Sequence, residues 1–368
     1  MSKPIYVTQS VLPELSEFIP YLEKIWESGV LTNGGPLHQQ LEQELCEYLG
    51  VDYISLFNNG TIALVVALQA LGLKSGEVIT TPYTFLATAH AIAWNNLTPV
   101  FVDIDPITSN IDPKEVEKAI TENTVAILPV HCYGIACDVE ALQNIANKHD
   151  LKLVYDAAHA FGVRYNDQSL LNYGDLSTVS FHATKVFNTF EGGAIICHSA
   201  EMKQRIDQLK NFGIIDETTV NDISLNGKLS EVHAALGLLQ LKSIDKILEA
   251  RMQVDQSYRN ALANIKGIQC IQRDNLDKDN YAYFPIIISD DYPLTRNQLF
   301  EKLKAHNIFS RKYFYPLMTD LNIYKQYKSD TPNAKLLSEQ VLCLPMYPAL
   351  ESDVIETIIK IIKNGSKK

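Results

Sequence analysis

LKLVYD, residues 151–156, is a short run of apolar, strand-forming residues that ends in an aspartate. Six comparable runs lie along the same part of the chain: VDYISLF (51–57), EVITT (77–81), TPVFVD (98–103), TVAILPV (124–130), LSTVSF (176–181) and GAIIC (193–197). Helical patterns lie between them, because leucine recurs every four residues over 37–49 and Asp112 and Pro113 begin another helix. This alternation is typical of βαβ units and predicts an α/β fold with a mainly parallel, seven-stranded sheet.

The pattern changes near residue 245. A helical pattern covers residues 228–265 and indicates a long connecting helix. Beyond it lie two strand-like runs, a capping box from Thr295 to Gln298 and a last amphipathic helix, at 267–271, 281–288, 295–298 and 354–362. We therefore predict a large α/β domain with the N-terminal segment over residues 1–245 and a smaller α+β domain over residues 246–368.

The composition narrows the class of protein. Of 368 residues, 46% are apolar and 20% are charged, and 32 Lys and Arg against 43 Asp and Glu give a net charge of -11. Because an acidic surface disfavours binding to a phosphate backbone, we expect no nucleic-acid partner. MSKPIYVTQSVLPEL has no signal-peptide pattern and no run approaches about 18 apolar residues, so we expect a cytoplasmic protein without a membrane span. We also expect no metal, since no Cys and His spacing forms a recognisable site.

Asn58, Asn59, Gly60 and Thr61 follow a predicted strand and begin the helical stretch TIALVVALQAL. The start of a helix offers free N–H groups and the positive end of the helix dipole, so this turn could bind a phosphate. The alternative is an ordinary loop in which Asn or Thr caps the helix and nothing binds.

Asp156 and His159 stand where the strand at 151–156 ends. Residues that face a ligand in open α/β sheets lie at the carboxyl ends of strands. A carboxylate there could hold a protonated heterocyclic nitrogen, and a histidine could lie against the ring. The alternative is that both residues only cap the next element.

Lys185 comes shortly after another predicted strand, in SFHATK (180–185). In a dry cleft the amine of a lysine becomes partly neutral and can form a Schiff base with an aldehyde. Taken by itself, Lys185 would be a solvated surface lysine, because lysine is mostly exposed.

The three sites point to one ligand when they are taken together. A phosphate seat, a carboxylate for a ring nitrogen and a lysine for an aldehyde are the parts that pyridoxal 5′-phosphate requires. Asp156 would keep the pyridine nitrogen protonated. Lys185 would hold the aldehyde and then move a proton as general acid and base.

With these motifs the sequence resembles the DegT/StrS family of nucleotide-sugar aminotransferases, which are pyridoxal-phosphate enzymes of fold type I. The likeness covers nearly the whole chain. It rests on five segments: LTNGGPLHQQLEQELCEYLG (31–50), NNGTIALVVAL (58–68), TPYTFLATAHAI (81–92), YDAAHAFG (155–162) and SFHATKVFNTFEGGAI (180–195).

The resemblance implies a role for each matching residue. Lys185 is the cofactor lysine and Asp156 the partner of the ring nitrogen, and these two are the catalytic residues. The other cofactor contacts that it implies are His159 and Phe85 at the ring, Gly60, Thr61 and Ser180 at the phosphate, and Asn226, in SLNGKLSEVHAALG, at the phosphate of a second subunit. The match of Asn226 implies a homodimer with shared active sites.

The resemblance also implies transamination, with L-glutamate as the donor and pyridoxamine 5′-phosphate as the intermediate form of the cofactor. His182 and the Glu191-Gly192-Gly193 pattern are similar to members that aminate C4 of a nucleotide-linked 4-keto-6-deoxyhexose. The expected reaction converts dTDP-4-keto-6-deoxy-D-glucose to dTDP-4-amino-4,6-dideoxy-D-glucose, a precursor of lipopolysaccharide O-antigen. The alternatives are amination at C3 or of another nucleotide keto sugar, and a regulator that binds the cofactor without turnover.

Five residues depart from the family pattern: Val186, Asn188, Phe190, Lys228 and Met318. We expect these changes to touch the substrate side rather than the cofactor side, so the identities of nucleotide and sugar stay open. For the nucleotide diphosphate we expect contacts from Lys228 and Arg311, with Tyr315 as a hydrogen-bond donor.

Overall fold

The computed structural model describes residues 3–273, 276–327 and 329–365. A seven-stranded sheet forms its centre, in the order β2 (Tyr53–Phe57), β10 (Gly193–Cys197), β9 (Leu176–Ser180), β6 (Lys152–Asp156), β5 (Thr124–Ile127), β3 (Glu77–Thr80) and β4 (Thr98–Phe101). Neighbouring strands pair in parallel, except that β10 is antiparallel to β2 and β9. Each strand lies within one of the seven predicted runs, so the predicted α/β fold with a mainly parallel sheet is confirmed.

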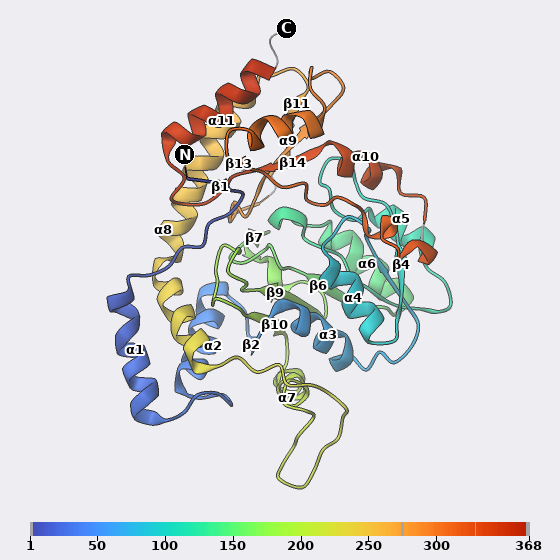
Figure 1. The fold of residues 1–368 in the computed structure, drawn as a ribbon. Coiled ribbons are helices and arrows are strands. Elements are labelled where there is room, and N and C mark those ends of the chain that lie inside the picture. The colour runs from blue at the N-terminus through green and yellow to red at the C-terminus, as the bar shows by residue number, and fades with distance from the viewer. Residues whose placement is uncertain (1–2, 274–275, 328, 366–368) are drawn as a thin grey trace.

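Helices cover both faces of this sheet (Figure 1). One face packs against α3 (Gly60–Ala70), α4 (Leu86–Trp94) and α7 (Ala200–Leu209). The other face packs against α2 (Pro36–Leu49), α5 (Pro113–Ala119), α6 (Val139–His149) and α8 (Glu231–Leu262). Because side chains alternate along a strand, Ala194 and Ile196 of β10 enter the core under α8, whereas Ile195 and Cys197 enter the core under α3.

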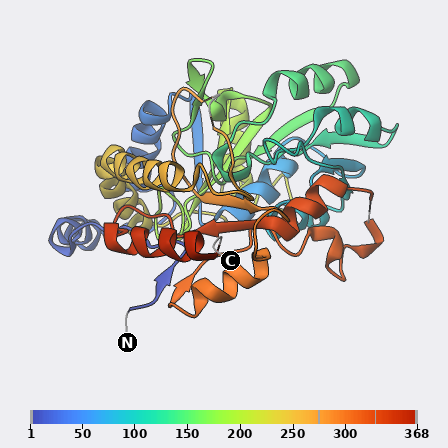
Figure 2. The same ribbon diagram turned by 90° about the horizontal axis from the view of Figure 1, so that it is seen from above.

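The C-terminal part is built on a smaller antiparallel sheet of β11 (Ile268–Cys270), β12 (Phe284–Ile288) and β14 (Val341–Leu344). Its helices are α9 (Arg296–Lys304), α10 (Pro332–Gln340) and α11 (Ser352–Gly365). The predicted capping box begins α9, since the N–H of Gln298 donates to the Thr295 hydroxyl and the N–H of Thr295 donates to the Gln298 side chain. The N-terminal strand β1 (Ile5–Tyr6) pairs in parallel with β13 (Ile308–Phe309), so it lies beside the C-terminal part (Figure 2).

The remaining elements lie outside these two sheets. Helix α1 (Leu15–Ser28) packs on α8, and β7 (Arg164–Tyr165) forms a short hairpin with β8 (Gln168–Ser169). Although α8 has 32 residues, neither it nor another helix of the described ranges has an apolar stretch that could cross a membrane.

α8 joins the two parts as one continuous helix, which confirms the long helix predicted over 228–265. Its buried residues up to Leu248 join the core of the large part, whereas Val254, Tyr258 and Leu262 join the core of the C-terminal part. The predicted domain boundary at 245/246 therefore falls inside α8, and β1 pairs across it. The division into two domains stays a prediction.

The contact of α2 with α8 provides a test of this packing. Leu41 is fully buried on α2, and a Cβ on Gly237 of α8 would lie 2.6 Å from one of its methyl carbons. Leu41→Ala leaves a cavity there, so we expect the free energy of unfolding to fall by about 3 kcal/mol. Gln43→Ala, on the exposed side of α2, should change it by less than about 0.5 kcal/mol. Urea denaturation followed by circular dichroism measures both, and equal midpoints would contradict the close packing.

Candidate active site

A pocket of about 390 Å³ lies at the edge of the sheet where β2, β3, β6 and β9 end and the antiparallel β10 begins. Parallel strands bring the loops that follow them to one edge, and ligands bind at that edge in open α/β sheets. The structure brings most of the predicted site residues together in its lining, namely Gly60, Thr61, Phe85, Asp156, His159, Ser180, Lys185 and Arg311.

The turn after β2 is capped and is also open to the pocket. The side chain of Asn59 accepts the N–H of Ile62 at 2.8 Å, so the capping alternative describes one true feature of this turn. The N–H groups of Gly60 and Thr61 are left without a partner inside the helix, because the first turn of a helix has none to offer. Both residues line the pocket, so these two N–H groups suit an anion.

Asp156 is 5% exposed and caps no helix. Its carboxylate accepts the hydroxyl of Thr88 at 2.7 Å and the N–H of Ala158 at 3.2 Å. Burial raises the pKa of this carboxyl, while the two hydrogen bonds and the charge of Lys185 act against the rise. Among the described residues it has no ion pair, and a buried carboxylate in this state fits a protonated nitrogen of a ligand.

His159 presents a neutral ring to the pocket. Its Nδ1 accepts the N–H of Tyr133 at 3.2 Å, which places the ring proton on Nε2. Burial lowers the pKa of His159 well below its ordinary value, and the charges of Lys185 and Arg273 lower it further. The ring lies nearly parallel to that of Phe314, with the centroids 6.2 Å apart, so both present flat apolar faces.

Lys185 is half-buried, and its amine lies in the pocket rather than in bulk water. Burial lowers the pKa of Lys185 to about 8, and the negative charge of Asp156 acts against this shift. Near neutral pH the amine is therefore present in both forms, so it can attack an aldehyde and can take or give a proton. The alternative of a solvated surface lysine does not fit this position.

Three predicted residues lie outside the pocket of a single chain. The amine of Lys228 donates to the side chain of Asn211, Asn226 is exposed, and Tyr315 is 46% exposed with its ring against the guanidinium of Arg296. Arg311 is thus the one predicted substrate residue that the pocket contains, and the roles of the other three stay predictions.

The five departures from the family pattern lie away from the pocket of a single chain, and the expectation that they touch the substrate side stays a prediction. None of them lines this pocket, and Met318 is buried against Ala89, Phe101 and Tyr324 instead. Apart from the predicted cofactor contacts, the polar lining of this pocket includes His182, Glu191, Arg311 and Tyr313.

Sequence reasoning missed Thr88, which bonds Asp156, and Tyr283, whose hydroxyl lies 3.5 Å from the amine of Lys185. Thr88 lies within the segment TPYTFLATAHAI and could have been found as a hydroxyl on the helix that faces the aspartate. Tyr283 has no comparable signal, because only tertiary packing brings it to Lys185.

Pyridoxal 5′-phosphate has a phosphate, a ring nitrogen and an aldehyde, and the pocket offers a fitting group for each of the three. No cluster of His, Cys, Asp or Glu within the described ranges could hold a metal ion. The fold and the pocket therefore define a class, the pyridoxal-phosphate-dependent enzymes of fold type I. Within it, the chain belongs to the DegT/DnrJ/EryC1/StrS aminotransferase family, whose pattern matches residues 14–363.

Individual relatives are similar over nearly their full length. The chain is 58% identical to a dTDP-4-amino-4,6-dideoxy-D-glucose transaminase of Shigella dysenteriae, over 99% of each chain. It is 51% identical to a protein of the same name from Escherichia coli, over 98% of each chain. Among solved structures, DesI in the presence of its TDP-sugar product has a TM-score of 0.94 at 33% identity and covers 100% of this chain and 94% of its own.

The charge of Asp156 provides a test of the site. Asp156→Asn removes the negative charge that favours the ammonium form of Lys185, so the pKa of Lys185 should fall below its value of about 8. The pH dependence of labelling by a neutral amine reagent, followed on the Lys185 peptide of the cofactor-free protein by mass spectrometry, measures this pKa. Asp52→Asn, a change at an exposed carboxylate, should leave it unchanged. An unchanged or higher pKa in Asp156→Asn would contradict the geometry.

Proposed function

We propose that this aminotransferase moves the amino group of L-glutamate to C4 of dTDP-4-keto-6-deoxy-D-glucose and so forms dTDP-4-amino-4,6-dideoxy-D-glucose. The observation that carries the proposal is the likeness at 58% and 51% identity to two transaminases of that name, over nearly the whole chain. The pocket supports it, because every group that the cofactor needs from one chain is present there.

The cofactor side of the pocket is assigned by charge and hydrogen bonding. Gly60, Thr61 and Ser180 hold the phosphate, and Asp156 keeps a proton on the ring nitrogen. His159, which the N–H of Tyr133 holds at its Nδ1, would lie against the cofactor ring, and Phe85 of the pocket lining would cover the other face. Bound pyridoxal phosphate would supply an electron sink. It would stabilise negative charge on the substrate carbon that carries the transferred nitrogen.

Lys185 is the acid and base of the reaction in this proposal. Its amine would hold the cofactor until the amine of the donor displaces it, and the freed amine would then take a proton from the donor carbon and later give one to the acceptor carbon. A pKa of about 8 suits both tasks, because the neutral and the charged amine are both populated near working pH. Glutamate and the keto sugar use the same pocket in turn, so the kinetics should be ping-pong.

The anionic groups of the substrates need a positive partner in an acidic protein. Arg311 lines the pocket, is exposed, and has no ion pair among the described residues. Its guanidinium fits the diphosphate of the nucleotide sugar, for which two parallel N–H donors are well matched.

The reaction is tested by incubating the purified protein with pyridoxal phosphate, L-glutamate and dTDP-4-keto-6-deoxy-D-glucose. We expect a nucleotide product with an amine at C4, identified by mass spectrometry and NMR. Lys185→Ala should lose both turnover and the covalent cofactor adduct that borohydride traps, whereas Lys152→Ala, at an exposed lysine, should keep both. An amine at C3, or no product although glutamate is consumed, would overturn the substrate assignment. Full turnover in Lys185→Ala would overturn the role of the lysine.

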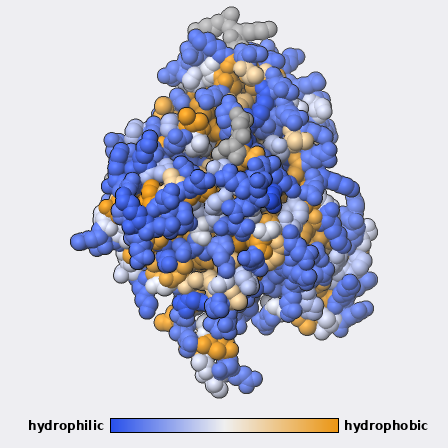
Figure 3. Space-filling model, turned by 180° about the vertical axis from the view of Figure 1, so that it is seen from behind, coloured by the Kyte–Doolittle hydropathy of each residue, from blue (hydrophilic) through white to orange (hydrophobic). Residues whose placement is uncertain are grey.

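We infer that the active form is a homodimer in which Asn226 serves the pocket of the other subunit. Asn226 lies in the loop of residues 211–228, which projects from the body between α7 and α8 (Figure 1). This loop exposes large apolar side chains, namely Phe212, Ile214, Ile215, Val220 and Ile223. Hydrophobic surface is visible on this projection, nearer to the body than its tip (Figure 3). An exposed apolar group of this size favours burial against another chain.

Mixing two inactive variants tests the shared site. Lys185→Ala and Asn226→Ala homodimers should each have little or no activity. If Asn226 acts across the interface, a mixed dimer contains one site with both residues intact, so exchange of subunits should restore activity. If Asn226 acts only within its own chain, no site is intact and the mixture stays inactive. Light scattering of each variant checks that the dimer itself persists.

A further inference from the structure

Tyr283 lies immediately before β12, in the C-terminal part, and reaches the pocket from there. The side chain is 6% exposed, and the amine of Lys185 lies 3.5 Å from its hydroxyl and 5.8 Å from its ring centroid. Within the described ranges, Lys185 is the one hydrogen-bond partner of this hydroxyl. The hydroxyl of Tyr283 therefore points toward the lysine and makes no other hydrogen bond within the described ranges.

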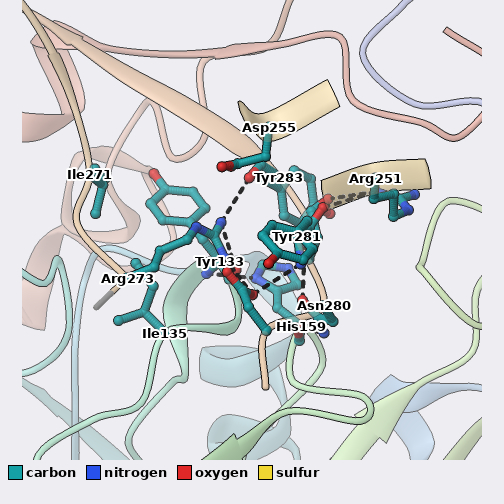
Figure 4. Close-up of polar contacts among 12 residues, drawn as sticks. Tyr133, Ile135, His159, Arg251, Asp255, Ile271, Arg273, Asn280, Tyr281 and Tyr283 are labelled. Atoms are coloured by element: carbon teal, nitrogen blue, oxygen red, sulfur yellow. Dashed lines mark hydrogen bonds and ion pairs between the residues drawn. The ribbon is translucent and has the colours of Figure 1, made fainter. Parts of the chain in front are cut away.

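Arg273, which belongs to a buried ion pair, holds the backbone next to this tyrosine, and Figure 4 shows it beside Tyr133 and Tyr283. Arg273 is 8% exposed and donates to both oxygens of Asp279, at 2.8 and 2.9 Å. The other end of its guanidinium donates to the carbonyl of Tyr283 at 2.8 Å and to the carbonyl of Tyr133 at 3.4 Å. A planar guanidinium fixes its acceptors in direction as well as in distance, so Tyr283 has a defined position relative to Tyr133.

Asn280 joins the same segment to the loop that carries His159. Its amide donates to the carbonyls of His159 and Phe161, at 2.7 and 2.9 Å, and its oxygen accepts the N–H of Ala282 at 3.0 Å. The rings of His159 and Tyr283 lie 4.7 Å apart as a result. The tyrosine is thereby fixed to the wall of the pocket that faces Lys185, although it comes from a distant part of the chain.

We propose that Tyr283 is a catalytic residue that holds the amine of Lys185 in both of its protonation states. Its hydroxyl accepts a hydrogen bond from the ammonium form and donates one to the neutral amine, so the lysine stays aimed into the pocket while it takes and gives a proton. The proposal rests on the role proposed above for Lys185. It adds to that role a residue from the C-terminal part of the chain.

The chemistry of the hydroxyl suits this task. Burial raises the pKa of Tyr283, so the phenol keeps its proton and remains both a donor and an acceptor. The other charged or titratable groups that line the pocket with Lys185 are Asp156, His159, His182, Glu191, Arg311 and Tyr313, and Asp156 is the charge that acts on its amine. Asp156 favours the ammonium by charge, whereas Tyr283 is the neutral group at hydrogen-bond distance from the amine.

Tyr283→Phe removes only this hydroxyl, and Tyr281→Phe is the matched control. Tyr281 lies two residues away and outside the pocket. In the cofactor-free protein, Tyr283→Phe should lower the pKa of Lys185 by about one unit, because the hydrogen bond lost by the charged ammonium is stronger than the one lost by the neutral amine. The measurement is the pH dependence of labelling of the Lys185 peptide. In the loaded enzyme, kcat for glutamate should fall about tenfold with KM nearly unchanged. Tyr281→Phe should change neither quantity.

The outcomes separate this proposal from the assigned function. A pKa of Lys185 that is equal in Tyr283→Phe and in the unaltered protein would overturn the role of the hydroxyl, whatever the sugar substrate is. A lowered pKa with unchanged kcat would overturn its part in catalysis. Thermal unfolding of both variants serves as a folding control, and equal midpoints are expected because the hydroxyl has no other partner. Loss of the lysine adduct is a separate test, made with Lys185→Ala.

Discussion

Two glycines and a serine meet at the sheet edge where β2, β10 and β9 lie side by side. A Cβ on Gly193 would lie 2.6 Å from the backbone nitrogen of Gly60, and a Cβ on Gly60 would lie 2.9 Å from the Cβ and 3.2 Å from the backbone Cα of Ser180. Backbone atoms cannot give way to a side chain at such distances, so the contact requires glycine at both positions. Because α3 begins at Gly60, this contact sets the helix start against the loop that carries Lys185. Close packing of these residues therefore sets the position of the predicted anion site, and charge acts within that geometry.

Burial at the same sheet edge shifts the pKa values of two groups in opposite directions. Burial raises the pKa of Asp156 and lowers that of Lys185, since it disfavours the charged form of each. The two groups influence each other by charge, yet they form no ion pair, and Asp156 is held by Thr88 instead. Both thus stay available to a ligand. A site with these properties is costly for an empty protein and well suited to a cofactor with a basic nitrogen and an aldehyde.

The sequence was sufficient for the large sheet because its strands are buried on both faces and therefore read as short apolar runs. Lys185 could not be identified from its own residue type, because lysine is mostly exposed. Only its occurrence together with the Asp156 and Gly60 motifs predicted a cofactor site. Tyr283 could not be found in this way, because it lies 98 residues from Lys185 and no spacing links them. The roles of Lys228 and Tyr315 stay predictions for a related reason: a motif places the backbone, whereas neighbours such as Asn211 and Arg296 decide where the side chain points.

The pocket has two walls of different construction. One is formed by residues at the ends of sheet strands, and the other by a loop of the C-terminal part. The cofactor residues stand at strand ends, whose positions are set by the sheet itself. The facing loop with Arg311 and Tyr313 comes from the C-terminal part and is held by hydrogen bonds from the hydroxyls of Tyr83 and Tyr133 to the carbonyl of Tyr313. Hydrogen bonds to a carbonyl do not depend on side-chain identity, so the exposed side chain of Arg311 can change without moving the backbone, whereas the ring of Tyr313 packs against Tyr283. The predicted cofactor residues thus lie on the sheet edge, whereas the facing wall with Arg311 comes from a loop of the C-terminal part, and the two walls can vary independently.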